Sequence, residues 1–360
     1  MNIKILVASA ALLVLAACGG DSTETPKPSP EPTPENNAPG DFTATVKNIT
    51  IDQATISWSN AIDPDGDTVN YTVKQGAVSS TSLSGNTHTF AGLTDGTNYN
   101  GTVTANDGNG GTNTANYTFK TEAKPTSNPG AFVIPSALAS YYKDMDFTKI
   151  DMPLFDDLAV LTISKHNNIL DYGERHNHLY GADKDPNNSA NVLLIYSGDS
   201  VDKREYLSGN NSYSPQTFNT EHLYPQSKLG NGNAVGDLHH LRTCNHQINS
   251  SRSNYPFTDG SGTYNLKNGA WYPGDEWRGD VARMILYVNL RYDEPLNGDI
   301  STSGINLFLK WNREDPVSAI EIQRNNVIQN SQGNRNPFID NPYLVTVIFG
   351  GEAAENRWAD

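Results

Sequence analysis

The most informative part of the chain lies between Asn219 and Phe257 and contains NTEHLYPQSK (219–228) and GDLHHLRTCNHQINSSRSNYPF (236–257). It holds four of the eight histidines of the chain, together with carboxylates, asparagines and arginines. Surface loops are commonly rich in Asn, Ser and Gly, but this stretch adds a candidate base, hard oxygen ligands and cations. Such a composition is typical of a catalytic site and suits the chemistry of phosphate esters.

Three residues of this stretch supply the parts of a metal-assisted hydrolase. Such an enzyme needs a neutral imidazole to accept a proton from water and hard oxygen ligands to hold a partly hydrated divalent ion. His222 provides the imidazole, and Glu221 and Asn249 provide the oxygens. Because His222 and Asn249 are 27 positions apart, a strand ending at His222, a returning strand near 237–241 and a helix carrying Asn249 fit between them.

The blocks TEHLYPQS, GDLHHLR and INSSRSNYPF resemble the signature sequences of the endonuclease I family, which comprises secreted and periplasmic nucleases with a ββα-metal (His-Me finger) site. The resemblance continues on both sides of the site, in DKDPNNSANVLLIYS (183–197), RGDVARMILYVNLRY (278–292), LKWNREDP (309–316) and GNRNPFID (333–340). A lone Glu-His pair is common by chance, but several matching blocks in the same order are not. The resemblance therefore implies an α+β nuclease domain.

The resemblance also implies roles for the three central residues. His222 is expected to act as the general base, and Glu221 and Asn249 to hold Mg²⁺, which Mn²⁺ or Ca²⁺ can replace. Water would then attack phosphorus in line, leaving 5′-phosphate and 3′-hydroxyl ends. The implied activity is a metal-dependent, largely sequence-nonspecific endonuclease that acts on DNA, and the family permits RNA as well.

Four further side chains are expected to contact the substrate. Arg252 is the candidate for holding the phosphate bidentately, and the others are His239, Arg242 and Arg283. Some periplasmic relatives carry the corresponding arginine on a disulfide-braced insertion that this chain lacks, so the assignment of Arg252 rests on its position alone. A solvated arginine is the alternative interpretation of Arg283.

The segment that contains Arg283 has the spacing of a helix. Its apolar residues at i, i+3, i+4 and i+7 form one stripe that is expected to be buried, namely Val281, Met284, Ile285 and Val288. Arg283 lies off this stripe, and Asp280 is a candidate N-cap. We therefore expect core scaffolding whose polar edge lines the active-site cleft.

The histidines allow two other interpretations. His239 and His240 can be a structural pair whose rings donate to backbone carbonyls. A zinc site is a further alternative, built from His222, His239, His240 and His246. Zinc sites usually show H-E-x-x-H or paired cysteines, and neither occurs in this stretch.

The N-terminal residues resemble a bacterial lipoprotein signal. Lys4 precedes an apolar run over 5–16, and Leu-Ala-Ala-Cys (15–18) resembles a lipobox. We expect residues 1–17 to be the signal peptide, Cys18 to carry the lipid, and the proline-rich residues 18–40 to be an extended tether. This predicts a bacterial envelope protein anchored to a membrane, with the outer membrane favoured because Gly19 follows the cysteine, or else an extracellular protein.

Residues 41–122 predict an all-β immunoglobulin-like sandwich. Short alternating runs are separated by Asp, Asn and Gly turns. Trp58, and Leu93 followed by Tyr99, resemble the core tryptophan and the tyrosine corner of fibronectin type III domains. The run DPDGD (63–67) is interpreted as a turn, because an EF-hand needs Glu at its twelfth position, where Lys74 stands. No sequence feature identifies a ligand of this sandwich.

The remaining residues divide into a linker over 123–135, a catalytic domain over 136–350 and a tail over 351–360. With Cys18 used for lipid, Cys244 has no partner within the chain, so no intramolecular disulfide is expected. We expect a monomer, with a dimer through Cys244 as the alternative.

Charge is the main argument against a nucleic-acid substrate. The formal net charge is −15, which should repel phosphates at long range. Between 221 and 291, however, seven basic residues stand against six acidic ones. We therefore expect weak, salt-sensitive binding through phosphates.

Two other functions remain open from the sequence. One is a non-catalytic surface adhesion or binding lipoprotein with a degenerate nuclease scaffold, against which the intact set of Glu221, His222 and Asn249 argues. The other is a phosphodiesterase that acts on RNA only, because the sequence does not distinguish a groove for duplex from one for single strands.

Overall fold

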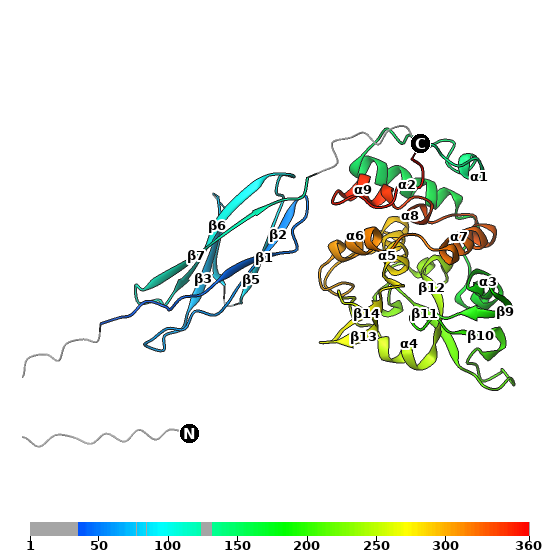
Figure 1. Ribbon diagram of the computed structural model, residues 1–360, viewed down its shortest axis with the longest axis horizontal. Helices are drawn as coiled ribbons and strands as arrows, with labels where there is room; N and C mark the ends of the chain where they lie inside the picture. The colour runs from blue at the N-terminus through cyan, green and yellow to red at the C-terminus, as the bar shows by residue number, and fades with distance from the viewer. Residues whose placement is uncertain (1–34, 77, 84, 124–131, 360) are drawn as a thin grey trace, which may run out of the picture.

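The computed structural model describes residues 35–76, 78–83, 85–123 and 132–359, which form an N-terminal β-sandwich and a C-terminal α+β domain (Figure 1). The expected signal peptide, the lipidated Cys18 and the first part of the tether lie outside the described residues. So do residues 124–131 of the expected linker. In the part of the chain that is described, none of the helices is long and apolar enough to cross a bilayer.

The N-terminal part contains two antiparallel sheets, which have the strand orders β1-β2-β5 and β4-β3-β6-β7. Its strands are β1 (Ala44–Lys47), β2 (Gln53–Trp58), β3 (Asn70–Gln75), β4 (Val78–Leu83), β5 (Thr87–Ala91), β6 (Asn98–Asn106) and β7 (Thr112–Lys120). Each of the alternating runs expected from the sequence forms a strand, and β4 is a further strand that the sequence did not predict. Its sequence, VSSTSL, lacks the alternation of apolar and polar residues that identifies the others.

Alternation along the strands explains the core of the sandwich. On β2, Ala54, Ile56 and Trp58 are buried while their neighbours are not, because successive side chains of a strand point to opposite faces. Trp58 packs against Tyr71 of β3, and the Tyr99 hydroxyl accepts a hydrogen bond from the Thr94 amide at 2.7 Å. The core tryptophan and tyrosine corner expected from the sequence are therefore confirmed.

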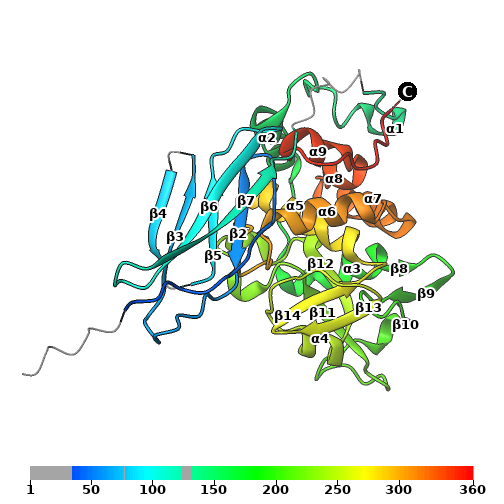
Figure 2. The ribbon, with the colours of Figure 1, turned by 60° about the vertical axis from the view of Figure 1, so that its left-hand side comes forward.

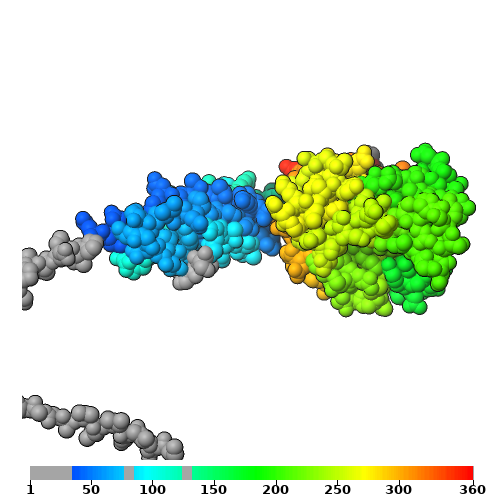
Figure 3. All heavy atoms as spheres, turned by 90° about the horizontal axis from the view of Figure 1, so that it is seen from below, coloured from blue at the N-terminus to red at the C-terminus, as the bar shows by residue number. Residues whose placement is uncertain are grey.

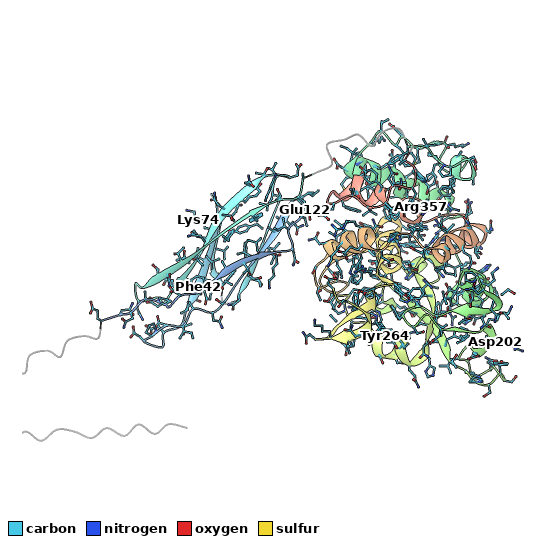
Figure 4. All side chains as sticks on the ribbon, in the orientation of Figure 1. Phe42, Lys74, Glu122, Asp202, Tyr264 and Arg357 are labelled. Atoms are coloured by element: carbon cyan, nitrogen blue, oxygen red, sulfur yellow. The ribbon has the colours of Figure 1, made fainter. Side chains whose placement is uncertain are left out.

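In the C-terminal part, most of the helices lie together in the upper half of the domain, and the small sheets lie below them (Figure 2). Its helices are α1 (Ser136–Ala139), α2 (Asp151–Lys165), α3 (Arg175–Ala182), α4 (His246–Arg252), α5 (Arg278–Tyr292), α6 (Ile305–Glu314), α7 (Ala319–Gln332), α8 (Pro337–Asp340) and α9 (Tyr343–Phe349). Its strands are β8 (Lys184–Asp185), β9 (Asn188–Leu193), β10 (Ser200–Asp202), β11 (Phe218–His222), β12 (Leu241–Asn245), β13 (Thr263–Lys267) and β14 (Ala270–Gly274). Asp202 of β10 and Tyr264 of β13 mark two of its hairpins in Figure 4, and Figure 3 shows one outer face of the whole molecule.

Helix α5 is the centre of this domain. The expected apolar stripe is buried, but so is most of the remaining surface of the helix, including Asp280 and Arg283. Asp280 is not the N-cap, because the helix begins after Trp277 and Asp280 lies inside the first turn. The expectation of a polar edge facing a cleft is therefore wrong: α5 is scaffold on all sides.

Two antiparallel strands and a short helix form the unit that carries the expected site. Strand β11 ends at His222, which pairs with Leu241 at the start of β12. Helix α4 follows β12 directly, and the Asn245 side chain caps it by accepting hydrogen bonds from the amides of Gln247 and Ile248. Figure 1 shows the three elements next to one another. The expected strand ending at His222 and the helix carrying Asn249 are confirmed. The returning strand is present but lies later than the expected 237–241, at Leu241–Asn245, because Leu238–His240 form a 3-10 turn.

Candidate active site

The docking of α4 onto β11 fixes the orientation of the Asn249 side chain. Its Nδ2 donates to the Thr220 carbonyl at 3.1 Å and to Asn219 Oδ1 at 2.9 Å. Since both of these partners accept hydrogen bonds, the amide nitrogen must face β11. The carbonyl oxygen of Asn249 is thereby the atom left for another partner.

A pocket of about 480 Å³ lies at the junction of β11 and α4. The three central residues expected from the sequence all line it. The complete lining is Thr220, Glu221, His222, Pro225, Gln226, Ser227, Asn249, Ser253 and Asn254. The fold therefore brings the imidazole, the carboxylate and the amide to one polar depression.

His222 is held in the protonation state that a general base requires. Its Nε2 lies 3.1 Å from the Val235 carbonyl, which can only accept, so the ring proton is on Nε2 and Nδ1 carries the lone pair. Burial, assisted by the neighbouring His240, lowers the pKa of His222 to about 3. The ring also stacks on Tyr172, with centroids 5.0 Å apart. At neutral pH the imidazole is uncharged and oriented.

Glu221 is buried beside two partners that engage the same oxygen. Oε1 lies 2.9 Å from Arg252 Nε and accepts a hydrogen bond from the Tyr196 hydroxyl at 3.0 Å. Burial raises the pKa of Glu221 to about 7, and the Arg252 guanidinium opposes this shift. Among the described residues, no side chain donates a hydrogen bond to Oε2. The Glu221 side chain lines the pocket.

The available atoms fit a hard divalent cation. Glu221 Oε2 and Asn249 Oδ1 are both oxygen donors, and both side chains line the same pocket. Magnesium characteristically takes one or two protein oxygens and keeps several waters, which suits a depression with two such donors. A cation here would also favour the charged form of the buried carboxylate.

The structure corrects the expectation that Arg252 holds the phosphate. Its side chain is fully buried beneath the pocket. Besides the ion pair with Glu221, its Nη1 donates to the Tyr255 carbonyl at 2.7 Å and its Nη2 to the Leu223 carbonyl at 3.1 Å. The guanidinium also lies over Phe257. These contacts make Arg252 a support for Glu221.

The structure likewise places His239, Arg242 and Arg283 away from the pocket. Arg242 is buried between Asp183 (3.0 Å) and Asp280 (3.1 Å). Arg283 is buried against Glu321, with Nε 2.6 Å from Oε1. His239 is buried, and its Nε2 faces the Asn334 carbonyl at 3.3 Å. The expectation of substrate contact is corrected for all three, because buried charges need fixed partners and these have them.

The interpretation of His239 and His240 as a structural pair is confirmed. His240 Nε2 lies 2.6 Å from the Ala234 carbonyl, and His239 makes the corresponding contact with Asn334. In the part of the chain that the structure describes, the histidines of the zinc alternative do not form a group that could hold a metal. Cys244 is buried and free, which removes a surface thiol for the dimer alternative.

One cation beside the pocket was missed in the sequence. Arg175, at the start of α3, lies over the Tyr172 ring at 3.8 Å, and Tyr172 in turn stacks on His222. Its Nε donates to the hydroxyl of Thr220, which lines the pocket, and its Nη1 donates to the Tyr172 carbonyl. Arg175 is half-buried. In the sequence it stands in YGERHNHLY (172–180), before the first of the blocks that resemble the family.

A neutral imidazole next to two oxygen donors, on a strand, strand and helix unit, defines the class of metal-dependent phosphate-ester hydrolases. The comparisons with known proteins agree with this class. The family model described as Endonuclease I matches residues 158–343, and the model of the fibronectin type III domain matches residues 37–121. The chain belongs to the endonuclease I family and carries an N-terminal fibronectin type III domain.

Several of its curated relatives are nucleases. An extracellular ribonuclease of Bacillus amyloliquefaciens is 37% identical over 59% of this chain and 79% of the relative. One from Bacillus subtilis is 34% identical over 61% of this chain and 84% of the relative. An extracellular deoxyribonuclease of Aeromonas hydrophila is 32% identical over 29% of this chain and 49% of the relative. The protein is thus a nuclease, and family members are generally metal-dependent.

The sandwich is similar to solved fibronectin type III domains. The domain of human fibronectin type III domain containing protein 3 is 18% identical and covers 28% of this chain and 99% of that chain, with a TM-score of 0.20. A matching region of chitinase A1 from Niallia circulans is 36% identical over 29% of this chain and 15% of the relative.

Proposed function

We propose that this protein is an endonuclease that hydrolyses both RNA and DNA without sequence preference. The observation that supports it best is the pocket where His222, with Nδ1 available, meets the oxygens of Glu221 and Asn249. The relatives that match over most of their length are named ribonucleases, while a deoxyribonuclease matches over a shorter region. Both substrates are therefore proposed.

In the proposed reaction, His222 Nδ1 accepts a proton from a water molecule as its oxygen bonds to phosphorus. The bond from phosphorus to the 3′ oxygen breaks, and the 3′ oxygen leaves and is protonated from solvent. A magnesium ion bound by Glu221 and Asn249 would supply positive charge for the phosphate oxygens. Arg252 and Tyr196 orient Glu221, and the Val235 carbonyl orients His222.

Arg175 is proposed to bind a phosphate of the substrate. Its guanidinium lies at the edge of the pocket, where Nε donates to the hydroxyl of Thr220, and its position over the Tyr172 ring limits its motion. Within the described chain, its Nη2 makes no hydrogen bond. A planar guanidinium with remaining donors suits a phosphate better than a point charge does.

This mechanism does not use the ribose 2′-hydroxyl. Water is the nucleophile, so a DNA strand and a 2′-O-methyl RNA strand should both be cleaved, unlike with ribonucleases that attack through the 2′-oxygen. The test is product analysis by mass spectrometry after magnesium-dependent digestion of matched RNA, DNA and 2′-O-methyl oligonucleotides. We expect 5′-phosphate and 3′-hydroxyl ends from all three. Products with 2′,3′-cyclic phosphates would contradict the proposal, and no cleavage would favour a binding protein with a degenerate scaffold.

We also propose that Cys18 anchors the enzyme to the bacterial envelope through lipid. Relatives are named extracellular or periplasmic nucleases, and the lipobox-like Leu-Ala-Ala-Cys supports attachment. Multiple acyl chains on one cysteine give stable anchoring. Fractionation of cells that express the full chain or Cys18→Ser tests this: we expect the unmodified chain in membranes and the variant in soluble fractions. Equal partitioning would overturn the anchor.

A further inference from the structure

The loop between β2 and β3 of the sandwich brings three carboxylates together. Asp63, Asp65 and Asp67 each place one oxygen within 4.8 Å of the others. The turn is shaped by Asp63, whose Oδ1 accepts hydrogen bonds from the amides of Asp65 at 2.9 Å and Asp67 at 3.2 Å. Gly66 permits it with a φ of +84°. The loop therefore concentrates negative charge that an ordinary turn does not need.

The second oxygen of Asp63 has no partner. The residue is only 7% exposed, and its Oδ2 is buried without a hydrogen bond. Leaving a buried carboxylate oxygen without a donor or cation is costly, more so than for a neutral group. The unpartnered oxygen is a second sign that a ligand is missing, and it does not depend on the geometry of the loop.

Other described side chains do not neutralise the cluster. Among the ion pairs found in the described parts of the chain, none involves these three aspartates. The side chains that contact them are carboxamides: Asn37 Nδ2 donates to Asp65 Oδ1 at 3.0 Å, and Asn109 Nδ2 donates to Asp67 Oδ2 at 2.8 Å. A carboxamide can present its oxygen instead by rotating. Carboxylates, carboxamides and loop carbonyls are the ligands that calcium prefers, and calcium accepts six to eight of them in irregular geometry.

We propose that Asp63, Asp65 and Asp67 bind a calcium ion at this end of the fibronectin type III domain. The site is separate from the nuclease pocket and lies where the chain enters the sandwich. The entering segment is already fastened there, because Asn37 contacts Asp65, Asn36 Nδ2 donates to Asp107 Oδ2 at 2.8 Å, and the Gly40 amide donates to the Ile62 carbonyl at 2.9 Å. Calcium would stiffen the joint between the tether and the sandwich.

Isothermal titration of the full chain with calcium chloride, in chelator-treated buffer, tests the proposal. We expect the unmodified chain to bind one more calcium ion than Asp63→Asn, with a Kd of about 10⁻⁴–10⁻³ M, the usual range of extracellular modules. Asp65→Asn, which changes an exposed member of the cluster and spares the turn, should weaken binding at least tenfold. Asp52→Asn, in the same domain but outside the cluster, is the matched control and should bind normally.

A second readout locates the ion and separates it from catalysis. Calcium should slow hydrogen exchange of the Asn37 and Gly40 amides in the unmodified chain but not in Asp65→Asn. Cleavage of oligonucleotides in magnesium should be unchanged in both aspartate variants, so a failure of the nuclease mechanism would not affect this test. Equal calcium stoichiometry in the unmodified chain, Asp63→Asn and Asp65→Asn would overturn the proposal, as would calcium-independent exchange of these amides.

Discussion

Single residues at the pocket divide into those that meet solvent and those that hold them in place. Glu221 belongs to both groups, because one oxygen contacts Arg252 and Tyr196 while the side chain itself lines the pocket. The neutral state of His222 arises in a similar way, from burial and from one hydrogen bond to a backbone carbonyl. The chemistry of both side chains is therefore set by neighbours that do not line the pocket.

Arg252→Ala should destabilise the protein and also reduce cleavage. Removing the guanidinium leaves Glu221 buried without its counter-charge, and breaking a buried ion pair from one side costs about 3–5 kcal/mol. Urea denaturation of the unmodified chain and the variant measures the free energy of unfolding. An unchanged free energy of unfolding with weakened substrate binding would show instead that Arg252 contacts phosphate.

Arg175→Ala should give the opposite pattern. Because this side chain is half-buried at the edge of the pocket, we expect little change in stability and a fall in kcat/KM of about tenfold or more, the loss of one charge-assisted hydrogen bond of about 1.5–3 kcal/mol. Arg204→Ala is the matched control, since Arg204 also lies over a tyrosine, Tyr213, but is exposed and paired with Asp202. Equal kcat/KM in both variants would remove Arg175 from the site.

The sequence identified the three side chains that share the pocket, but it did not identify which arginines are buried. Glu221, His222 and Asn249 stand in recognisable blocks, and the structure brings them to one pocket. One partner of Arg242, Asp280, and the partner of Arg283, Glu321, each lie 38 positions further along the chain. The other partner of Arg242, Asp183, lies well before it. Pairing over that distance depends on tertiary packing, so local pattern could not separate a buried arginine from a substrate-binding one.

Helix α5 is joined to the start of helix α7 by a buried ion pair. Glu321 receives Arg283 and also completes the capping box of α7, where its Oε2 accepts from the Ser318 amide at 2.9 Å. One carboxylate therefore joins the centre of α5 to the first turn of α7. The apolar periodicity of α5 was visible in the sequence, but this role of Arg283 was not.

Removing one charge of the Arg283–Glu321 pair should lower the stability of the protein more than replacing both charges by apolar side chains. Arg283→Met alone leaves Glu321 buried and uncompensated, so we expect a loss of about 3–5 kcal/mol in the free energy of unfolding. The double variant Arg283→Met/Glu321→Leu removes both charges and should recover part of that loss, although the cap is also removed. Urea denaturation of Arg283→Met, Glu321→Leu and the double variant measures the three free energies of unfolding. If the double variant lost more free energy of unfolding than the two single variants together, a favourable charge interaction between the two residues would be contradicted.

For the whole molecule, the distribution of charge differs from what the sequence suggested. The near balance over 221–291 counted Arg242, Arg252 and Arg283, which are all buried in ion pairs. They cannot form a basic surface for a polyanion. With a net charge of −15, binding must depend on local contacts at the pocket and on the metal.

The rate should accordingly depend only modestly on salt. A protein that makes one or two phosphate contacts has a slope of about −1 to −2 in a plot of log affinity against log salt concentration. We expect this slope for the KM-derived affinity of a short oligonucleotide, measured in fixed magnesium as sodium chloride is varied. A slope several times steeper would indicate many more phosphate contacts than the pocket and Arg175 provide.

The two-part architecture was accessible from the sequence because each part has its own signal. Alternating runs and turn residues indicated the sandwich, and family blocks indicated the nuclease domain. Strand β4 was missed because its sequence, VSSTSL, lacks the alternation of apolar and polar residues. The carboxylate cluster at 63–67 was interpreted only as a turn, because the unpartnered oxygen of Asp63 becomes visible only in three dimensions.

We propose that His222 is the base of a metal-dependent nuclease. The first experiment compares the cleavage rates of RNA and DNA oligonucleotides by the full chain and by His222→Ala, in magnesium and in excess chelator. His178→Ala, outside the pocket, serves as the control, and circular dichroism verifies folding. We predict that chelation abolishes cleavage and that His222→Ala lowers kcat by about 10²–10⁴-fold while substrate binding persists. A folded His222→Ala variant with normal kcat would contradict the account.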